Sequence, residues 1–185
     1  MTDLDNAPGN LRDLLAEIQA HPGCVVESPD SRSVTVDARH RVPTDLRELH
    51  QLCAGVSLHV DADYPWWLTG PSGVVPAGPL LLTPEVAEQV AAEDPADLTN
   101  SCYVIAQEAP GATGGQLVVV DLHPERVGRC YLTAWDSFGL VGEMPIVALS
   151  MAELLGWLLR LRGGNPMDHL PDLGDAYDAL PGSPD

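Results

Sequence analysis

The stretch from Cys102 to Leu161 constrains the fold more than any other part of the sequence. It contains three strand-like runs, Tyr103 to Gln107, Leu117 to Val120 and Arg129 to Trp135, and each link between them contains glycine. Links of this kind favour hairpins, so we expect an antiparallel sheet. The middle run is wholly apolar and mostly valine, which predicts a strand covered on both faces.

The third run alternates with a period of two, as a strand requires. Its small residues Cys130 and Ala134 share one face with Leu132, while Tyr131 and Thr133 share the other. We therefore expect a helix to cover the face that carries the small residues.

That helix follows directly in the sequence. Ser150 and Glu153 have the spacing of a capping box, in which the hydroxyl and the carboxylate satisfy backbone N–H groups at a helix N-terminus. Leucines at helical spacing follow as far as Leu161, and Gly163, Gly164 and Pro166 end the helix.

Three earlier helices are predicted from their caps: one opened by Asn10 and ended by 21–23, one over 41–55 with Gly55 as its left-handed cap, and one opened by Thr83 and running to about Glu93. The Val-rich runs 24–27 and 33–37 predict a small hairpin. The sequence thus predicts an α+β fold, with a central twisted antiparallel sheet flanked by N-terminal and C-terminal helices.

The length of 185 residues is typical of one domain with a single sizeable core. We expect a disordered N-terminus over 1–9, a domain over 10–162 and an acidic C-terminal tail over 163–185 that docks one apolar turn. No apolar run reaches the length of a membrane span, and the first twenty residues lack the pattern of a signal peptide. These features predict a cytoplasmic protein.

Charge is the most unusual property of the composition. The formal net charge is −18, lysine is absent, and no basic residue occurs between Arg47 and Arg126. Such a field repels nucleic acid and membrane surfaces and speeds association with a basic protein. The alternative is that the acidity serves only solubility.

No motif for metal binding or catalysis is visible. The four cysteines are widely spaced among apolar neighbours, which predicts ordinary buried thiols, and the six histidines form no ligand motif. Ser101 and Ser137 lack the setting of a nucleophile elbow. Asp121 and His123 are two residues apart and form a conceivable acid–base pair, although a strand-end Asp more often binds turn amides. We therefore expect no catalytic residue, no metal and no cofactor.

One cluster has the composition of a protein interface. It combines carboxylates with large aromatic side chains on a predicted loop, and aromatic residues dominate the energetics of many interfaces. The alternative is that the tryptophan pair packs as a lid on the sheet. The candidate partner-binding residues are Asp61, Asp63, Tyr64, Trp66 and Trp67, together with Asp136 further along the chain.

The order of these elements resembles the SMI1/KNR4 family of the SUKH superfamily, from about Leu11 to Leu161. Pro43, Asp45, Leu46 and Gly55 resemble the family's N-terminal helix, and Tyr103 to Ala106, Gly115, Leu117 to Asp121, Gly128 and Tyr131 resemble its central strands and turns. Its closing strand and Ser-capped helix resemble Val147, Ala148, Ser150, Glu153, Leu154 and Leu155. The chain departs from the family in having Tyr103 where a tryptophan is usual.

The resemblance implies an α+β domain that binds a protein partner without catalysis. Many bacterial members look like immunity proteins, which neutralise a toxin by binding it inside the producing cell. Such toxins are often nucleases, whose basic cleft an acidic surface complements. The alternatives are a cellular adaptor or regulator of the same fold and, further removed, a small hydrolase. Either a monomer or a homodimer is compatible with the sequence.

Overall fold

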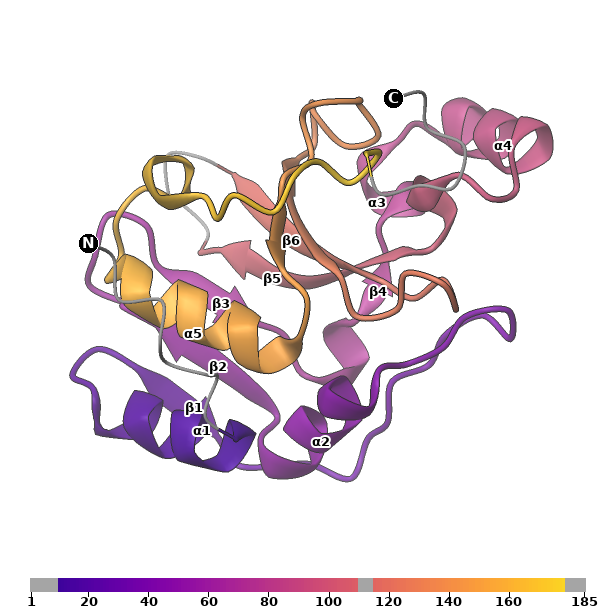
Figure 1. The fold of residues 1–185 in the computed structure, drawn as a ribbon. Helices are drawn as coiled ribbons and strands as arrows, with labels where there is room; N and C mark the ends of the chain where they lie inside the picture. Colours follow the sequence, from indigo (N-terminus) through magenta and orange to yellow (C-terminus); the bar gives the residue numbers. More distant parts are fainter. Residues whose placement is uncertain (1–9, 110–114, 179–185) are drawn as a thin grey trace.

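The structure is a computed structural model that describes residues 10–109 and 115–178 (Figure 1). The helices are α1 (Leu11–Ala20), α2 (Thr44–Leu52), α3 (Gly78–Leu81), α4 (Pro84–Glu93) and α5 (Met151–Leu161), with short 3-10 helices η1 (Pro71–Gly73), η2 (Leu98–Asn100) and η3 (Pro166–His169). The strands are β1 (Val25–Glu27), β2 (Gly55–Leu58), β3 (Trp66–Leu68), β4 (Val75–Pro76), β5 (Cys102–Glu108), β6 (Gln116–Asp121), β7 (Cys130–Ala134) and β8 (Ile146–Ala148).

All the strands belong to one sheet, in the order β1-β2-β3-β5-β6-β7-β8, and every neighbouring pair is antiparallel. The short β4 pairs with the first half of β5, next to β3, which pairs with the second half. The predicted α+β fold with a central antiparallel sheet and flanking helices is therefore confirmed.

One face of the sheet is covered by α1, α2 and α5, and α5 lies in front of the strands in Figure 1. The N-terminal caps predicted for α1 and α5 are present. Asn10 Oδ1 accepts from the Asp13 N–H at 3.0 Å, and Ser150 Oγ accepts from the Glu153 N–H at 3.2 Å. The Glu153 carboxylate in turn accepts from the Leu149 N–H at 2.8 Å, which completes the capping box.

The opposite face is covered over only part of its width. Among the described residues of the second core cluster, none comes from β1, β2 or β3. Val119 of β6 points into this cluster while Val118 and Val120 point to the helices, so the predicted burial of this strand on both faces is confirmed. The second cluster contains Ala77, Leu98, Cys102, Val104, Val119, Tyr131, Phe138, Met144, Ile146 and Ala176.

The chain beyond α5 contributes to this second cluster. The Met144 N–H donates to Asp175 Oδ2 at 2.9 Å, the Ala176 N–H donates to the Met144 carbonyl at 2.9 Å, and Ala176 has no exposed surface. Residues 163–178 are thus attached to the β7–β8 connection. The segments expected to be a disordered N-terminus (1–9) and the end of an acidic tail (179–185) lie outside the described residues.

The expected hairpin of the runs 24–27 and 33–37 is wrong. The run 24–27 pairs with β2, with Val25 opposite Ser57, and the run 33–37 is not a strand. Val34 and Val36 instead pack against the helix-side core, which satisfies their apolar side chains without a hairpin.

Gly55 is not a left-handed helix cap. The α2 helix ends at Leu52, Cys53 is already extended, and Gly55 opens β2. A Cβ atom on Gly55 would lie 3.1 Å from the Leu68 carbonyl oxygen, so glycine allows the close approach of β2 and β3.

Candidate functional site

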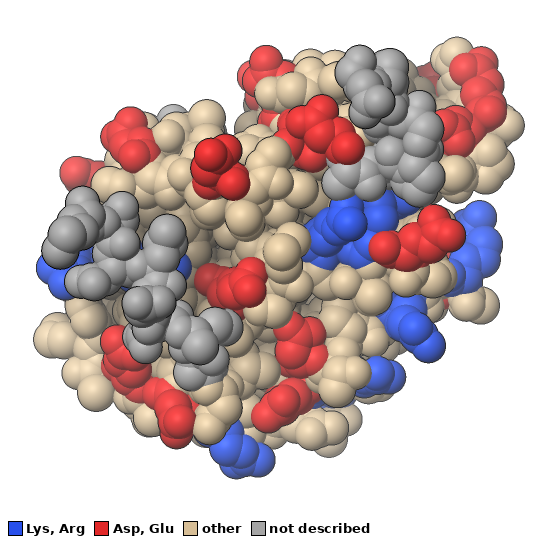
Figure 2. Space-filling model, viewed as in Figure 1, with Lys and Arg blue, Asp and Glu red and all other residues tan. Residues whose placement is uncertain are grey.

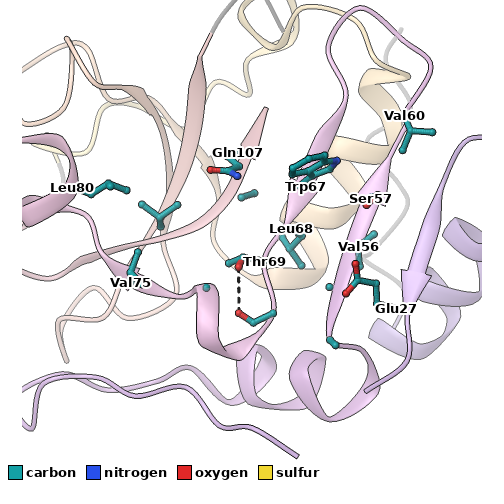
Figure 3. A pocket seen from close by; sticks show the side chains of 16 residues that line it. Glu27, Val56, Ser57, Val60, Trp67, Leu68, Thr69, Val75, Leu80 and Gln107 are labelled. Atoms are coloured by element: carbon teal, nitrogen blue, oxygen red, sulfur yellow. Dashed lines mark hydrogen bonds between the residues drawn. The ribbon is translucent and has the colours of Figure 1, made fainter. Parts of the chain in front are cut away.

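The uncovered part of the sheet forms a broad hollow over β1 to β5, of about 610 Å³ (Figure 3). We call this surface the open sheet face. Figure 3 shows Trp67 between β2 and β5, with Val75 and Leu80 on one side of the hollow and Val60 and Glu27 on the other. The residues that line it are Glu27, Ala54, Gly55, Val56, Ser57, Val60, Trp67, Leu68, Thr69, Gly70, Gly73, Val75, Leu80, Val104, Ala106 and Gln107.

Strand register explains which side chains reach this face. Directly opposed residues on neighbouring strands point to the same side of a sheet. Val25 pairs with Ser57, Ser57 with Trp67, and Trp67 with Gln107, which in turn pairs with Leu117 of β6. Leu117 packs against the second core cluster. The row of side chains from Val25 to Gln107 therefore faces the open surface, and along this row the covered part of the face begins at β6.

The open sheet face is apolar for a solvent-exposed surface. Trp67 is 40% exposed, and exposed aliphatic side chains from other segments of the chain line the same hollow. Exposed apolar side chains gathered on one surface mark interaction sites more often than isolated residues do. The aliphatic members are Val60, Val75 and Leu80, each more than a third exposed, and the exposed Val25 extends the row of Ser57 and Trp67 on β1.

The charge of this face is one-sided. Glu27 is the one ionisable side chain among the described residues that line the hollow, and neither Arg nor Lys lines it. Strands β2 to β6 all lie between Arg47 and Arg126, where the sequence contains no basic residue. A basic partner therefore meets no repulsive cation within the hollow.

The floor of the hollow depends on a close backbone crossing at Gly70. A Cβ atom there would lie 1.9 Å from the Ala54 carbonyl oxygen, a distance that real side chains do not reach. Thr69 beside it donates a hydroxyl hydrogen bond of 3.4 Å to the Gly70 carbonyl, drawn as the dashed line in Figure 3. Only glycine permits the chain to turn from β3 into η1 at this position.

The β2–β3 loop places the predicted acidic residues next to the open sheet face. Asp61 and Asp63 are exposed, and Tyr64 is half-buried. The loop is fixed to the end of α5, because the Tyr64 N–H donates to the Gly163 carbonyl at 3.2 Å and Gly163 packs against Ala62. Val60, two residues before Ala62, already lines the hollow.

Two of the six candidate residues do not belong to this surface. Trp66 has no exposed surface and belongs to the helix-side core, so it is a core residue and not a contact residue. Asp136 is exposed but lines a separate hollow of about 560 Å³ on the β7–β8 connection, together with Leu140 and Met167. The alternative in which the tryptophan pair packs on the sheet describes Trp66 correctly, but Trp67 faces solvent.

Sequence reasoning missed Val25, Ser57, Val75, Leu80 and Gln107. These residues come from five separate segments. The pairing of β1 to β5 brings the four strand residues into one sheet, and α3, which follows β4, adds Leu80. One local signal of this surface was present in the sequence. Consecutive strand residues point to opposite faces, so one tryptophan of the pair Trp66 and Trp67 had to face away from the core.

The buried polar residues at the end of β6 form a structural network. Asp121 and Arg126 are joined at 2.6 Å, and Asp121 also accepts from the Ser101 hydroxyl, the Tyr131 hydroxyl and the His123 N–H. Burial, reinforced by the Asp121 charge, raises the pKa of Tyr131 far above its usual range. Because Asp121 binds the His123 backbone and has no exposed surface, it does not form the conceivable acid–base pair with the His123 ring.

The charged surface opposite the open sheet face has no single acidic centre. Figure 2 shows acidic side chains spread over the helix-covered face, while most of the basic side chains in view lie along one side. One group of side chains in the described ranges has donor atoms that can hold a metal ion: His21, Cys24 and His59. None of the described helices is both long and apolar enough to cross a membrane.

Comparison with known proteins gives one informative relative. The chain is 29% identical over 170 residues to Immunity protein YokJ from Bacillus subtilis (strain 168), and the similarity covers 90% of this chain and 95% of that protein. No protein-family model matches the chain. No solved structure matches it either. The chain is thus similar, over nearly its whole length, to a protein named for immunity.

Proposed function

We propose that this protein is an immunity-type binding protein that neutralises a toxin by direct contact inside the producing cell. The observation that carries this proposal is the similarity to an immunity protein over 90% of the chain. Because the similarity covers 90% of the chain, it is not limited to one motif.

We also propose that the domain is of the SMI1/KNR4 type. The order of the elements supports this assignment: α2 begins after Pro43, the hairpins β5–β6–β7 follow, and β8 leads into α5 through the Ser150 cap. These are the elements on which the sequence resemblance rests.

The toxin binds at the open sheet face, with Trp67 as the central anchor. Tryptophan is one of the residue types most enriched in interface hot spots, and Trp67 is 40% exposed within the hollow. Asp61 and Asp63 lie on the adjoining loop, where their carboxylates are free to meet basic side chains of the partner. Asp136 lines another hollow and is a peripheral contact at most.

The partner is basic, and nuclease toxins satisfy this condition. The support is the net charge of −18 and the lack of any basic side chain among the described residues that line the hollow. An acidic protein is attracted to a basic cleft at long range, which speeds association and lowers its dissociation constant at low salt.

The protein acts by occlusion and not by catalysis. The hydroxyls of Ser57 and Thr69 are among the groups that line the hollow, but Glu27 is the one ionisable group with them. An arranged nucleophile, base and oxyanion donor is the minimum for acyl or phosphoryl transfer, and this lining does not supply it.

Co-expression tests the proposed function. We expect the gene of the toxin to lie next to the gene of this protein. The product of that neighbouring gene is expressed alone and with this protein in a sensitive host, and the surviving cells are counted. We expect the neighbour to be toxic alone and harmless with wild-type protein. Trp67→Arg should lose protection, whereas Trp135→Arg, a matched substitution at a tryptophan that is 73% exposed and does not line the hollow, should keep it.

A neighbour that is not toxic, or whose toxicity the wild-type protein does not reduce, contradicts the immunity role. In that case, recovery of a different partner from the native cytosol selects the adaptor alternative. Equal protection by the Trp67→Arg and Trp135→Arg variants contradicts the proposed surface but leaves the immunity role standing.

A further inference from the structure

Three side chains with metal-binding donor atoms meet at one end of the sheet, and none of them is among the residues that line the open sheet face. His21 ends α1, Cys24 immediately precedes β1, and His59 immediately follows β2. The antiparallel pairing of β1 and β2 brings the last two together, and the Val60 N–H continues it by donating to the Gly23 carbonyl at 2.9 Å. The ends of α1, β2 and α5 lie side by side here, on the left of Figure 1.

The separations between the donor atoms are those of a metal site. Cys24 Sγ lies 3.7 Å from His21 Nδ1 and 3.9 Å from His59 Nδ1, and all three ligand atoms lie within 4.8 Å of one another. A tetrahedral zinc ion, with bonds of about 2.3 Å to sulfur and about 2.1 Å to nitrogen, places these two kinds of atom about 3.6 Å apart. Shifts of a few tenths of an ångström therefore bring both nitrogens to that distance from the sulfur.

His59 is held in the orientation that a ligand needs. Its Nε2 lies 3.0 Å from the Leu159 carbonyl oxygen, which can only accept, so Nε2 carries the proton and Nδ1 presents its lone pair toward Cys24. Metal-bound histidines commonly donate their second ring nitrogen to a backbone carbonyl in this way.

The backbone of His59 is also unusual. Its φ is +53°, in the left-handed region that a non-glycine residue rarely occupies, and its side chain is 6% exposed. Such a conformation is strained and occurs most often where a side chain must be held in place for a function.

His21 requires one adjustment on binding. Its Nδ1 lies 2.7 Å from the Pro22 carbonyl oxygen, so this nitrogen carries a proton in the metal-free protein. Binding of an ion at Nδ1 requires loss of that proton and a turn of the ring away from the Pro22 carbonyl oxygen, toward the Cys24 sulfur that lies 3.7 Å from Nδ1. The His21 and His59 rings meet edge to face, with centroids 5.1 Å apart, which leaves the thiol between their nitrogens.

We propose that His21, Cys24 and His59 bind a zinc ion that joins the end of α1, the β1–β2 pair and, through His59, the end of α5. One thiolate and two imidazoles are ligands that zinc prefers, and they offer little to Mg²⁺ or Ca²⁺. Three protein ligands leave a fourth position for water. Cys24 is only half-buried, so an ion reaches the site without unfolding.

The inference is tested on the full-length protein after removal of metal with a chelator. Titration with Co²⁺ should produce a thiolate-to-cobalt charge-transfer band at one equivalent, and Zn²⁺ should displace it. Cys24→Ser should abolish the band and weaken zinc binding at least about 10-fold. His169→Gln, which changes an exposed histidine outside the cluster, should leave both unchanged.

A thermal melt gives a second readout. Free zinc at about 100 times its dissociation constant should raise the Tm of the wild-type protein by about 5 °C or more, and Cys24→Ser should remove most of this rise. A wild-type titration without a charge-transfer band contradicts the inference. So does undiminished zinc binding by the Cys24→Ser variant, whose fold is checked by circular dichroism.

Discussion

Trp66 and Trp67 are consecutive in β3, yet Trp66 has no exposed surface and Trp67 is 40% exposed. Trp66 points into the core beneath α1, α2 and α5, and Trp67 points into the open sheet face. The same pair thus supplies a core residue on one side of the sheet and a partly exposed aromatic side chain on the other. This separation places the proposed binding site on a face that folding has left uncovered.

The two tryptophans predict losses of stability of different size. Trp66→Ala should lower the free energy of unfolding by about 3–5 kcal/mol, because it removes a large side chain from a packed core. Trp67→Ala should lower it by a clearly smaller amount, because 40% of this residue is already exposed. Urea denaturation of the two variants checks this, and equal losses would contradict the assignment of the two faces.

A second prediction concerns Asp45, which joins α2 to the start of α5. Its Oδ2 accepts from the Met151 N–H at 2.6 Å, at the positive end of the α5 dipole. Asp45→Ala should cost about 1.5–3 kcal/mol, the usual contribution of a hydrogen bond to a charged group. Ser150→Ala, which removes only the neutral cap of the same helix, should cost about 1 kcal/mol. Chemical denaturation measures both, and an Asp45→Ala variant with wild-type stability would rule out a role for this contact.

The buried ion pair at the end of β6 predicts a larger loss. Asp121→Asn should destabilise the fold by about 3–5 kcal/mol, because it leaves the Arg126 guanidinium buried without a counter-charge. Arg126→Met in the same background removes the unpaired charge and should recover part of the loss. Failure of the second substitution to recover any stability, measured by thermal and urea unfolding, would contradict this account.

Stability should also depend on pH through His50. Burial lowers the pKa of His50 below its ordinary value of 6.5, although a hydrogen bond to the Thr69 carbonyl opposes the shift. Just below pH 6.5 the unfolded chain therefore binds more protons than the folded chain. The contribution of His50 to the free energy of unfolding is fully present above that pH and is lost as the pH falls through the pKa of His50 in the folded protein.

The measurement is the urea midpoint at about pH 7.5 and about pH 5.5. We expect a lower midpoint at the acidic pH, and His50→Gln should reduce the difference. Burial also lowers the pKa of His40, which adds to the wild-type effect with the same sign, so the comparison with the variant isolates His50. A difference that His50→Gln leaves unchanged would contradict the assignment.

The parts of the fold that sequence predicts well are those whose signals are local. The capping box of Ser150 and Glu153 defined the start of α5, and the glycine-bearing links between valine-rich runs defined the hairpins β5–β6–β7. In each case, residues a few positions apart satisfy one another's hydrogen bonds, so the pattern is visible without the tertiary structure.

The parts that it predicts poorly depend on partners far along the chain. β1 pairs with β2 across the whole of α2, whereas sequence proximity favoured a hairpin with 33–37. For the same reason, the open sheet face, assembled from segments between Glu27 and Gln107, was represented in the sequence prediction by Trp67 alone. The sequence prediction found no metal motif among the histidines and cysteines, because His59 joins His21 and Cys24 only through the pairing of β1 with β2.

The most direct test of the central claim is the affinity of this protein for the purified product of the neighbouring gene, measured by titration calorimetry for wild type, Trp67→Ala and Trp135→Ala. The account predicts tight binding by the wild type and by Trp135→Ala, and a dissociation constant at least about 30-fold higher for Trp67→Ala, as expected of an anchor worth about 2 kcal/mol. Absence of wild-type binding, or equal affinities for the two tryptophan variants, would contradict it.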